Sequence, residues 1–234
     1  MTGIAYNPKL TGRPITSMED LFSDEFAGRV GMFGDLSDLP NTALLAIGAA
    51  PEESSPSEWR AAAELLRKQR DRGIVREYYQ QDYFRALLRG DVAVTQAWSG
   101  DVYQLNTSGD PEGLQFVIPR EGGLIWTDCM CVPKRALHPA DAIRLMDFVY
   151  RPDVAAMISG YVAYVSPVPA AREVLERMAA EATDAAEGAQ LADLASSPLV
   201  FPTEDDVARL RTYRELSEDE ELEWNRLFEP IYGG

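Results

Sequence analysis

The sequence predicts an α/β fold with a mixed, mostly parallel sheet flanked by helices. Short apolar runs typical of buried strands alternate with helical patterns between residues 3 and 132, and such alternation builds parallel sheets through helical crossovers. The stretch Leu87 to Val94 shows one junction, where a helical pattern stops at Gly90 and a buried strand follows. The chain has 234 residues, 46% of them hydrophobic, so a substantial core is expected.

The predicted strands are short and apolar, and several end at turn-forming residues. In chain order they are Gly3 to Tyr6, Arg29 to Phe33, the region of Ile74 and Val75, Val92 to Trp98, Leu114 to Ile118, and Leu124 to Val132.

Capping patterns mark the helices of this part of the chain. Thr16, followed three residues later by Glu19, predicts a short helix. Ser55 and Glu58 enclose Pro56 and predict a longer helix that ends near Gly73. The remaining helices are expected at Asn41 to Gly48, at Asp82 to Leu88 and after Trp98.

From Ala140 onward the chain is expected to be mostly helical. Ile143, Met146 and Val149 form an apolar stripe. The Ala-rich and Ser-rich stretch that ends at Pro198 is expected to be a loose surface segment. The later helices are expected to begin at Pro152, after Pro169 and at Ser217, where Glu220 completes a capping box and Trp224 and Phe228 follow on one side.

The charge balance narrows the function classes. A formal net charge of -16 disfavours binding to nucleic acid and to anionic membrane surfaces, whose phosphates it would repel. An acidic protein suits a cationic ligand. The alternative is that the acidic residues serve only to keep the protein soluble. No apolar run is long enough to span a bilayer, and the opening residues lack the basic and apolar pattern of a signal peptide.

Cysteine and histidine are scarce, so neither a zinc cluster nor a histidine-based triad is expected. Cys129 and Cys131 lie two positions apart on a predicted strand. A disulfide between them would strain the backbone, so both are expected to be buried free thiols. His138 precedes a proline and is expected in a loop. No metal or cofactor is predicted.

The segment Gly123 to Pro133 carries the main functional signal. Side chains alternate on a strand, so Trp126 and Asp128 are expected on one face. A carboxylate beside an aromatic ring recognises an organic cation, because the carboxylate binds the ammonium and the ring attracts its charge. Trp98 and Asp101 flank a Ser-Gly loop that opens a helix, and both are candidate contacts. The structural alternatives are a core tryptophan and a helix first-turn charge.

Five segments, in order, resemble the spermidine/putrescine-binding family of extracytoplasmic solute-binding proteins of ABC transporters. The matching segments are Ser17 to Val30 ("SWADLW…YKG" in the family), Leu88 to Gly100 ("EGEV…WNG"), Arg120 to Asp128 ("PKEGGIFWMD"), Ala142 to Val154 ("ALKLINFLLRPDVA") and Tyr164 to Pro167 ("YPTP"). The family also has a "WGTTGIAYNP"-like crossover, and this chain opens on its second half, Thr2 to Pro8.

The resemblance implies a periplasmic-binding-protein type II fold, in which two lobes close on a solute and deliver it to permease subunits. Residues 1–126 would form the second, carboxy-terminal lobe, 127–165 would return to a first lobe missing here, and 166–234 would pack back on the second lobe. A chain so shortened is expected to bind weakly and to self-associate through its uncovered helices. The location would be periplasmic or otherwise extracytoplasmic, a lipoprotein anchor included.

The resemblance also implies ligand contacts at Asp35, Asp38 and Tyr164, beside Trp98, Asp101, Trp126 and Asp128. Helix capping is the alternative for both Asp35 and Asp38, and hinge packing is the alternative for Tyr164. The favoured solute is a putrescine-like or spermidine-like polyamine. Another organic cation, an amino-acid derivative, a metal complex, or a lobe that only docks a partner remain alternatives. A hydrolase using Asp35 and Asp128 is disfavoured, since no nucleophile and base pattern accompanies them.

Overall fold

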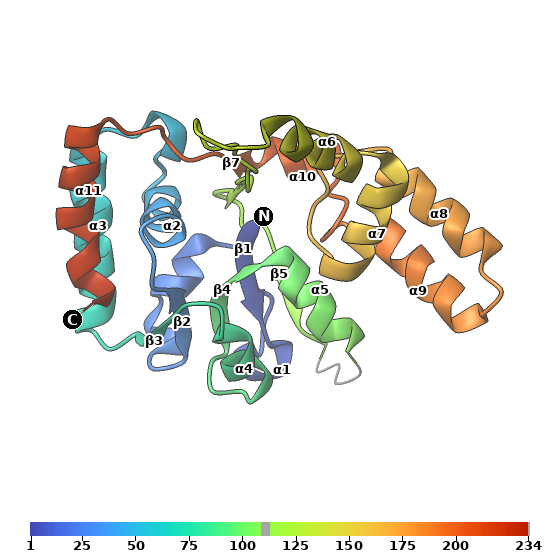
Figure 1. The fold of residues 1–234 in the computed structure, drawn as a ribbon. Coiled ribbons are helices and arrows are strands. Elements are labelled where there is room, and N and C mark those ends of the chain that lie inside the picture. The colour runs from blue at the N-terminus through green and yellow to red at the C-terminus, as the bar shows by residue number, and fades with distance from the viewer. Residues whose placement is uncertain (109–112, 234) are drawn as a thin grey trace. The chain divides into compact units, whose positions relative to one another are not determined.

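The computed structural model describes residues 1–108 and 113–233, which fall into two compact units (Figure 1). Unit 1 contains Met1–Trp126 together with a return segment that begins at Asp205, and unit 2 contains Thr127–Glu204. Residues 166–204 therefore belong to the same unit as 127–165. The assignment of these parts to lobes of a larger protein stays a prediction.

A mixed sheet forms the centre of unit 1. Its order is β3-β2-β4-β1-β6-β7, with β5 also paired to β1. Among the described residues every strand except β1 points in one direction, since β1 pairs antiparallel with β4, β5 and β6 while the other pairs are parallel. The strands are β1 Thr2–Tyr6, β2 Val30–Phe33, β3 Val75–Tyr79, β4 Val94–Trp98, β5 Gln115–Val117, β6 Gly123–Leu124 and β7 Leu210–Arg211.

Helices cover this sheet and supply the rest of the core of unit 1. They are α1 Pro8–Thr11, α2 Asp38–Ala46, α3 Pro56–Asp71, α4 Tyr83–Leu88, α5 Ser99–Thr107, α10 Glu204–Ala208 and α11 Glu218–Tyr232, with 3-10 helices η1 Met18–Phe22, η2 Asp24–Phe26 and η3 Pro51–Glu53. The predicted capping boxes of α3 at Ser55 and of α11 at Ser217 are confirmed. The return segment brings α11 alongside α3 (Figure 1).

The register of β1 sets up the candidate site. Thr2 pairs with Trp98 at the end of β4 and also with Leu124 of β6. Trp98 and the residues just after β6 therefore lie at the same end of these central strands, on either side of Thr2.

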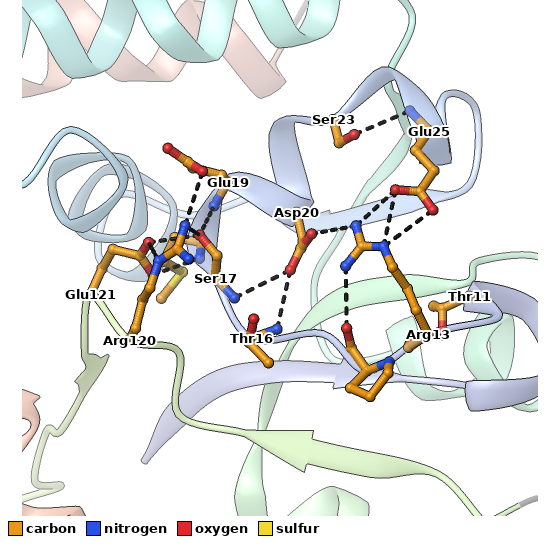
Figure 2. A network of polar contacts seen from close by, with 12 residues as sticks. Thr11, Arg13, Thr16, Ser17, Glu19, Asp20, Ser23, Glu25, Arg120 and Glu121 are labelled. Atoms are coloured by element: carbon orange, nitrogen blue, oxygen red, sulfur yellow. Dashed lines mark hydrogen bonds and ion pairs between the residues drawn. The ribbon is translucent and has the colours of Figure 1, made fainter.

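A polar clamp holds the turn that leads into β6, as Figure 2 shows. The Glu121 carboxylate accepts hydrogen bonds from the Ser17 hydroxyl (2.6 Å) and the Met18 backbone N–H (2.8 Å). Arg120 donates to the Ser17 hydroxyl at 3.0 Å and to the Glu19 carboxylate at 3.1 Å. Burial raises the pKa of Glu121, but the hydrogen bonds from Ser17 and Met18 outweigh it and hold that pKa below its ordinary value.

Replacing Glu121 by glutamine is expected to lower the free energy of unfolding by about 1–2 kcal/mol, because the donors of Ser17, Met18 and Arg120 lose a charged acceptor. The effect should be largest at neutral pH and should fade below pH 4.5, the ordinary pKa, as the acid protonates. Urea unfolding would measure it. Glu19→Gln is the control, because the Glu19 side chain is 74% exposed, and equal effects of the two substitutions would contradict the clamp.

Unit 2 consists of four helices and their connecting segments: α6 Pro139–Val149, α7 Pro152–Val162, α8 Ala171–Glu181 and α9 Ala185–Ser196. Helices α7, α8 and α9 pack on one another in sequence. Helix α6 buries none of its residues. Several large apolar side chains of this unit are exposed: Met130, Leu137, Ile143, Leu145, Phe148, Tyr150, Met157, Ile158 and Tyr161. No described helix of either unit combines the length and apolarity that crossing a membrane requires.

Four predictions about secondary structure, capping and burial are wrong. The strand expected at Leu124 to Val132 ends at Leu124 as β6, and no strand or helix follows until α6. Cys129 and Cys131 are exposed, because the segment that carries them lies outside the sheet. The stretch expected to be loose forms α9, capped by Asp184. The cap of η1 is Ser17, one residue later than expected, with Asp20 as its partner.

Candidate functional site

The structure distributes the predicted site residues over the two units. Unit 1 holds Asp35, Asp38, Trp98, Asp101 and Trp126, and unit 2 holds Asp128 and Tyr164.

Two tryptophans form the aromatic part of the site in unit 1. The rings of Trp98 and Trp126 meet edge to face, with centroids 5.9 Å apart and an angle of 71°. Behind Trp98 lie Phe33 at 5.1 Å and Tyr83 at 6.2 Å between ring centroids. Both tryptophan side chains are half-buried, so each retains exposed surface that a solute could contact.

Asp38 lies beneath Trp98. It is the first residue of α2 and is only 3% exposed. Its Oδ2 accepts a hydrogen bond from Trp98 Nε1 (3.1 Å), and its Oδ1 accepts one from the Tyr213 hydroxyl (2.8 Å). Burial, and then the nearby charge of Asp35, raise the pKa of Asp38 to about 6, although bonds from Trp98, Tyr213 and Thr2 oppose that rise.

Asp35 occupies the loop between β2 and α2. Its Oδ1 accepts backbone hydrogen bonds from Ser37 (2.7 Å), Asp38 (2.6 Å) and Leu39 (3.4 Å). This carboxylate therefore caps the start of α2 and sits where the helix dipole favours a negative charge. Burial still raises the pKa of Asp35, and the three backbone bonds act against that rise.

Asp101 lies in the first turn of α5. Its Oδ2 accepts a hydrogen bond from the Tyr83 hydroxyl at 2.6 Å, and the same hydroxyl accepts one from the Trp98 backbone N–H at 3.1 Å. Tyr83 thus joins Asp101 to the tryptophan pair. In unit 1 the predicted residues form one connected group.

Asp128 and Tyr164 line a common pocket in unit 2. This pocket has a volume of about 170 Å³ and is otherwise lined mainly by apolar side chains of α7 and of the segment after it, such as Ile158 and Val165. Asp128 is exposed and lies in the irregular segment after β6. The strand alternation that predicted a shared face for Trp126 and Asp128 is therefore wrong, because neither residue is on a strand. Their role as ligand contacts stays a prediction.

Two residues of the network, Thr2 and Tyr213, were not among the predicted contacts. The Thr2 hydroxyl accepts a hydrogen bond from Trp126 Nε1 at 3.1 Å, and Tyr213 comes from the return segment, 175 positions after Asp38. Tyr83 was visible in an aromatic cluster with Tyr78 and Tyr79 but had no motif around it. The pairing of Thr2 with Trp98 across two strands could be inferred only from the fold.

The electrostatics of the site favour a positive charge. Three carboxylates, those of Asp35, Asp38 and Asp101, surround the tryptophan pair within unit 1. Burial lowers the pKa of the Met1 α-amino group, whereas the charges of Asp38 and Asp101 act to raise it. At Met1 burial outweighs these charges, so their field opposes the lowering of the pKa without reversing it.

Comparison with known proteins identifies the family. Residues 1–191 match the family described as "Bacterial extracellular solute-binding protein". The chain belongs to this family. Solute-binding proteins are a transport class and not a class of enzymes. The fold agrees, since a "Putative spermidine/putrescine ABC transporter from Listeria monocytogenes" superimposes with a TM-score of 0.82 at 21% identity, over 98% of this chain and 66% of that one. The predicted periplasmic-binding-protein type II fold is confirmed.

Two curated solute-binding proteins illustrate the sequence similarity. The putrescine/agmatine-binding protein of Pseudomonas aeruginosa is 31% identical over 191 residues, which is 75% of this chain and 52% of that protein. The spermidine/putrescine-binding periplasmic protein of Escherichia coli is 29% identical over 175 residues, 75% of this chain and 48% of that protein. The chain thus spans about half the length of the curated relatives it matches.

Proposed function

We propose that this chain is part of the solute-binding component of an ABC transporter and captures a putrescine-like or spermidine-like polyamine for delivery to permease subunits. The observation that carries the proposal is the hydrogen-bonded group of two tryptophans and three carboxylates in unit 1. Linear polyamines present ammonium groups at the ends of methylene chains. Aromatic faces attract the charge and cover the methylenes, and carboxylates supply the counter-charge.

The relatives support the same solute class and location. The two curated proteins are named for putrescine, agmatine and spermidine, and the E. coli protein is named as periplasmic. We therefore infer an extracytoplasmic location for this chain. The proposed contacts in unit 1 are Trp98 and Trp126 as the aromatic walls and Asp35 and Asp101 as the charges, with Asp38 as the buried acid beneath Trp98. In unit 2, Asp128 and Tyr164 are proposed contacts of their own. No catalytic step and no cofactor are required.

Calorimetric titration with putrescine and spermidine tests this function. 1,4-Butanediol is the matched control ligand, since it replaces both ammonium groups by hydroxyls on the same carbon chain. We expect heat from the amines and none from the diol. Trp126→Ala should weaken amine binding about tenfold or more, because it removes one aromatic face. Tyr161→Ala, at a side chain that is 88% exposed in unit 2, should leave binding unchanged.

The alternatives predict different outcomes of the same experiment. Binding of the diol as tightly as putrescine would contradict recognition of charge. Heat only from other organic cations, amino-acid derivatives or metal complexes would keep the transport function and exclude the polyamine. No heat from any solute, together with permease docking that survives the substitution of Trp126 and Asp128, would indicate a lobe that only docks.

Permease docking and self-association remain proposals of their own. The exposed apolar side chains of α6 and α7, such as Ile143, Phe148 and Tyr161, form a surface of the kind that protein partners cover. Helix α6 contributes most directly, because none of its residues is buried.

A further inference from the structure

The buried carboxylate of Asp38 is already occupied by protein donors. Trp98 Nε1 binds Oδ2 and the Tyr213 hydroxyl binds Oδ1, and the Thr2 side chain is a further hydrogen-bond partner. With 3% of the residue exposed, little surface remains for a solute ammonium. A direct ionic contact would have to displace one of these donors.

The Asp38 carboxylate also helps to hold the indole N–H groups of both Trp98 and Trp126. Trp98 is held by Asp38 directly. Trp126 is held by the Thr2 hydroxyl at 3.1 Å, and Thr2 in turn contacts Asp38. The edge-to-face geometry of the two rings, 71° between planes, therefore rests on hydrogen bonds that converge on one buried acid.

Tyr213 completes the arrangement from the return segment. Burial and the adjacent Asp38 charge raise the pKa of Tyr213, so its hydroxyl stays protonated and acts as a donor. The bond it makes is 2.8 Å long, an ordinary length for an O–H···O bond, and spans 175 positions of sequence. It fixes the carboxylate on the side opposite Trp98.

We propose that Asp38 is a positioning residue of the solute site, held by Tyr213, which sets the orientation of the Trp98 ring and does not itself contact the solute. The inference rests on the proposed function for its binding readout. The contact with solute is left to the ring that Asp38 orients.

The charged and titratable groups around Asp38 come from each neighbouring element. Asp35 in the loop before α2 adds a like charge that raises the pKa of Asp38, and Tyr213 from the return segment lowers it. The Met1 α-amino group at the start of β1 lies in the field of Asp38 and Asp101. Protonation of Asp38 would weaken its bonds to both donors, so the surroundings of Trp98 should change as the pH falls.

Tryptophan emission in the absence of solute tests the arrangement. We expect the emission to titrate with a midpoint near pH 6, the pKa of Asp38. Asp38→Asn should abolish this transition, and so should Trp98→Phe, which identifies the reporting ring. Tyr213→Phe should move the midpoint to higher pH, because it removes a hydrogen bond that stabilises the ionised acid. Tyr161→Phe is the matched control and should change nothing.

Putrescine affinity then separates positioning from contact in a double-mutant cycle. Tyr213→Phe, Asp38→Asn and Trp98→Phe should each weaken binding, with about three- to tenfold expected for the single hydrogen bond lost in Tyr213→Phe. In the Trp98→Phe background, Asp38→Asn should add less than about threefold, since it acts through the indole N–H.

Several outcomes would overturn the proposal. One is a loss of putrescine affinity on Asp38→Asn that is as large in the Trp98→Phe background as in the parent. Another is the absence of a pH transition in the tryptophan emission of the parent protein. A third is a transition midpoint that does not move in Tyr213→Phe. Failure of the parent protein to bind any amine would instead defeat the proposed function, and the emission titration would still decide whether Asp38 holds Trp98. If the Asp38→Asn protein fails to fold, the emission titrations of the parent protein and of Tyr213→Phe still test the proposal.

Discussion

Replacing Trp59 by alanine is expected to lower the free energy of unfolding by about 3–5 kcal/mol, the range for deleting a fully buried aromatic side chain. Trp59 lies in α3 and is 0% exposed. Its ring meets Trp224 of α11 edge to face at 5.3 Å, and the Arg214 guanidinium lies 5.5 Å from its centroid. Its Nε1 donates to the Ser54 hydroxyl at 2.9 Å. The substitution would leave a cavity between α3 and α11 and remove one hydrogen bond from the Ser54 hydroxyl, which still donates to the Pro51 carbonyl at 2.8 Å.

Urea unfolding followed by far-ultraviolet circular dichroism measures this effect. Trp59→Phe should retain part of the packing and fall between the parent and the alanine variant. Leu222→Ala, at a side chain of α11 that is 55% exposed, should change stability by less than about 0.5 kcal/mol. A Trp59→Ala protein as stable as the Leu222→Ala protein would show that α11 does not pack on α3.

The second large effect is a pH dependence of stability from Asp38. Burial raises the pKa of this acid from 3.8 to about 6 in the folded protein. Because the folded state then binds the proton more tightly than the unfolded chain, ionised Asp38 destabilises the fold above pH 6. Acidification from pH 6 to 3.8 removes that penalty, which amounts to about 3 kcal/mol for a shift of this size.

Comparison with Asp38→Asn isolates this contribution. Carboxylates with lowered pKa values, such as those of Glu58 and Glu121, act in the opposite direction but are common to both proteins. We expect the stability of the parent, relative to Asp38→Asn, to rise by about 3 kcal/mol between pH 7 and pH 3.5. Denaturant unfolding at several pH values measures the difference, and a difference that stays constant with pH would refute the raised pKa.

Local signals predicted much of unit 1. The capping boxes at Ser55 and Ser217 and the glycine stop at Gly90 each involve residues within a few positions of one another, so the sequence alone determines them. The association of Trp98 with Trp126 was also expected, because the resemblance placed both in one site. These predictions needed no knowledge of which strands pair.

Predictions failed where partners far apart in the sequence decide the outcome. Ile125, Trp126, Met130 and Val132 fit a strand pattern, but β6 pairs with β7 only at Gly123 and Leu124, and a segment without a neighbouring strand gains nothing from being extended. The exposure of Cys129 and Cys131 follows from the same failure. Helix α9 could have been predicted, since Asp184 is a good cap and alanine a strong helix former.

Asp38 is a second case in which a partner far away in the sequence could not be predicted. Asp38 was recognised as a candidate from the resemblance, and helix capping was its alternative. Neither interpretation included Tyr213, because no motif surrounds that residue and only the return of the chain to unit 1 brings its hydroxyl to the carboxylate.

The discontinuity of unit 1 has a consequence for the order in which the protein is made. Ribosomes add about 5–20 residues per second, so the stretch from Thr127 to Glu204 separates the two parts of unit 1 by roughly 4–16 s of synthesis. During that interval Trp59 lacks Trp224, β6 lacks β7, and Asp38 lacks Tyr213. The nascent chain therefore presents an unfinished core to chaperones, and the candidate site of unit 1 is complete only after the last segment has emerged.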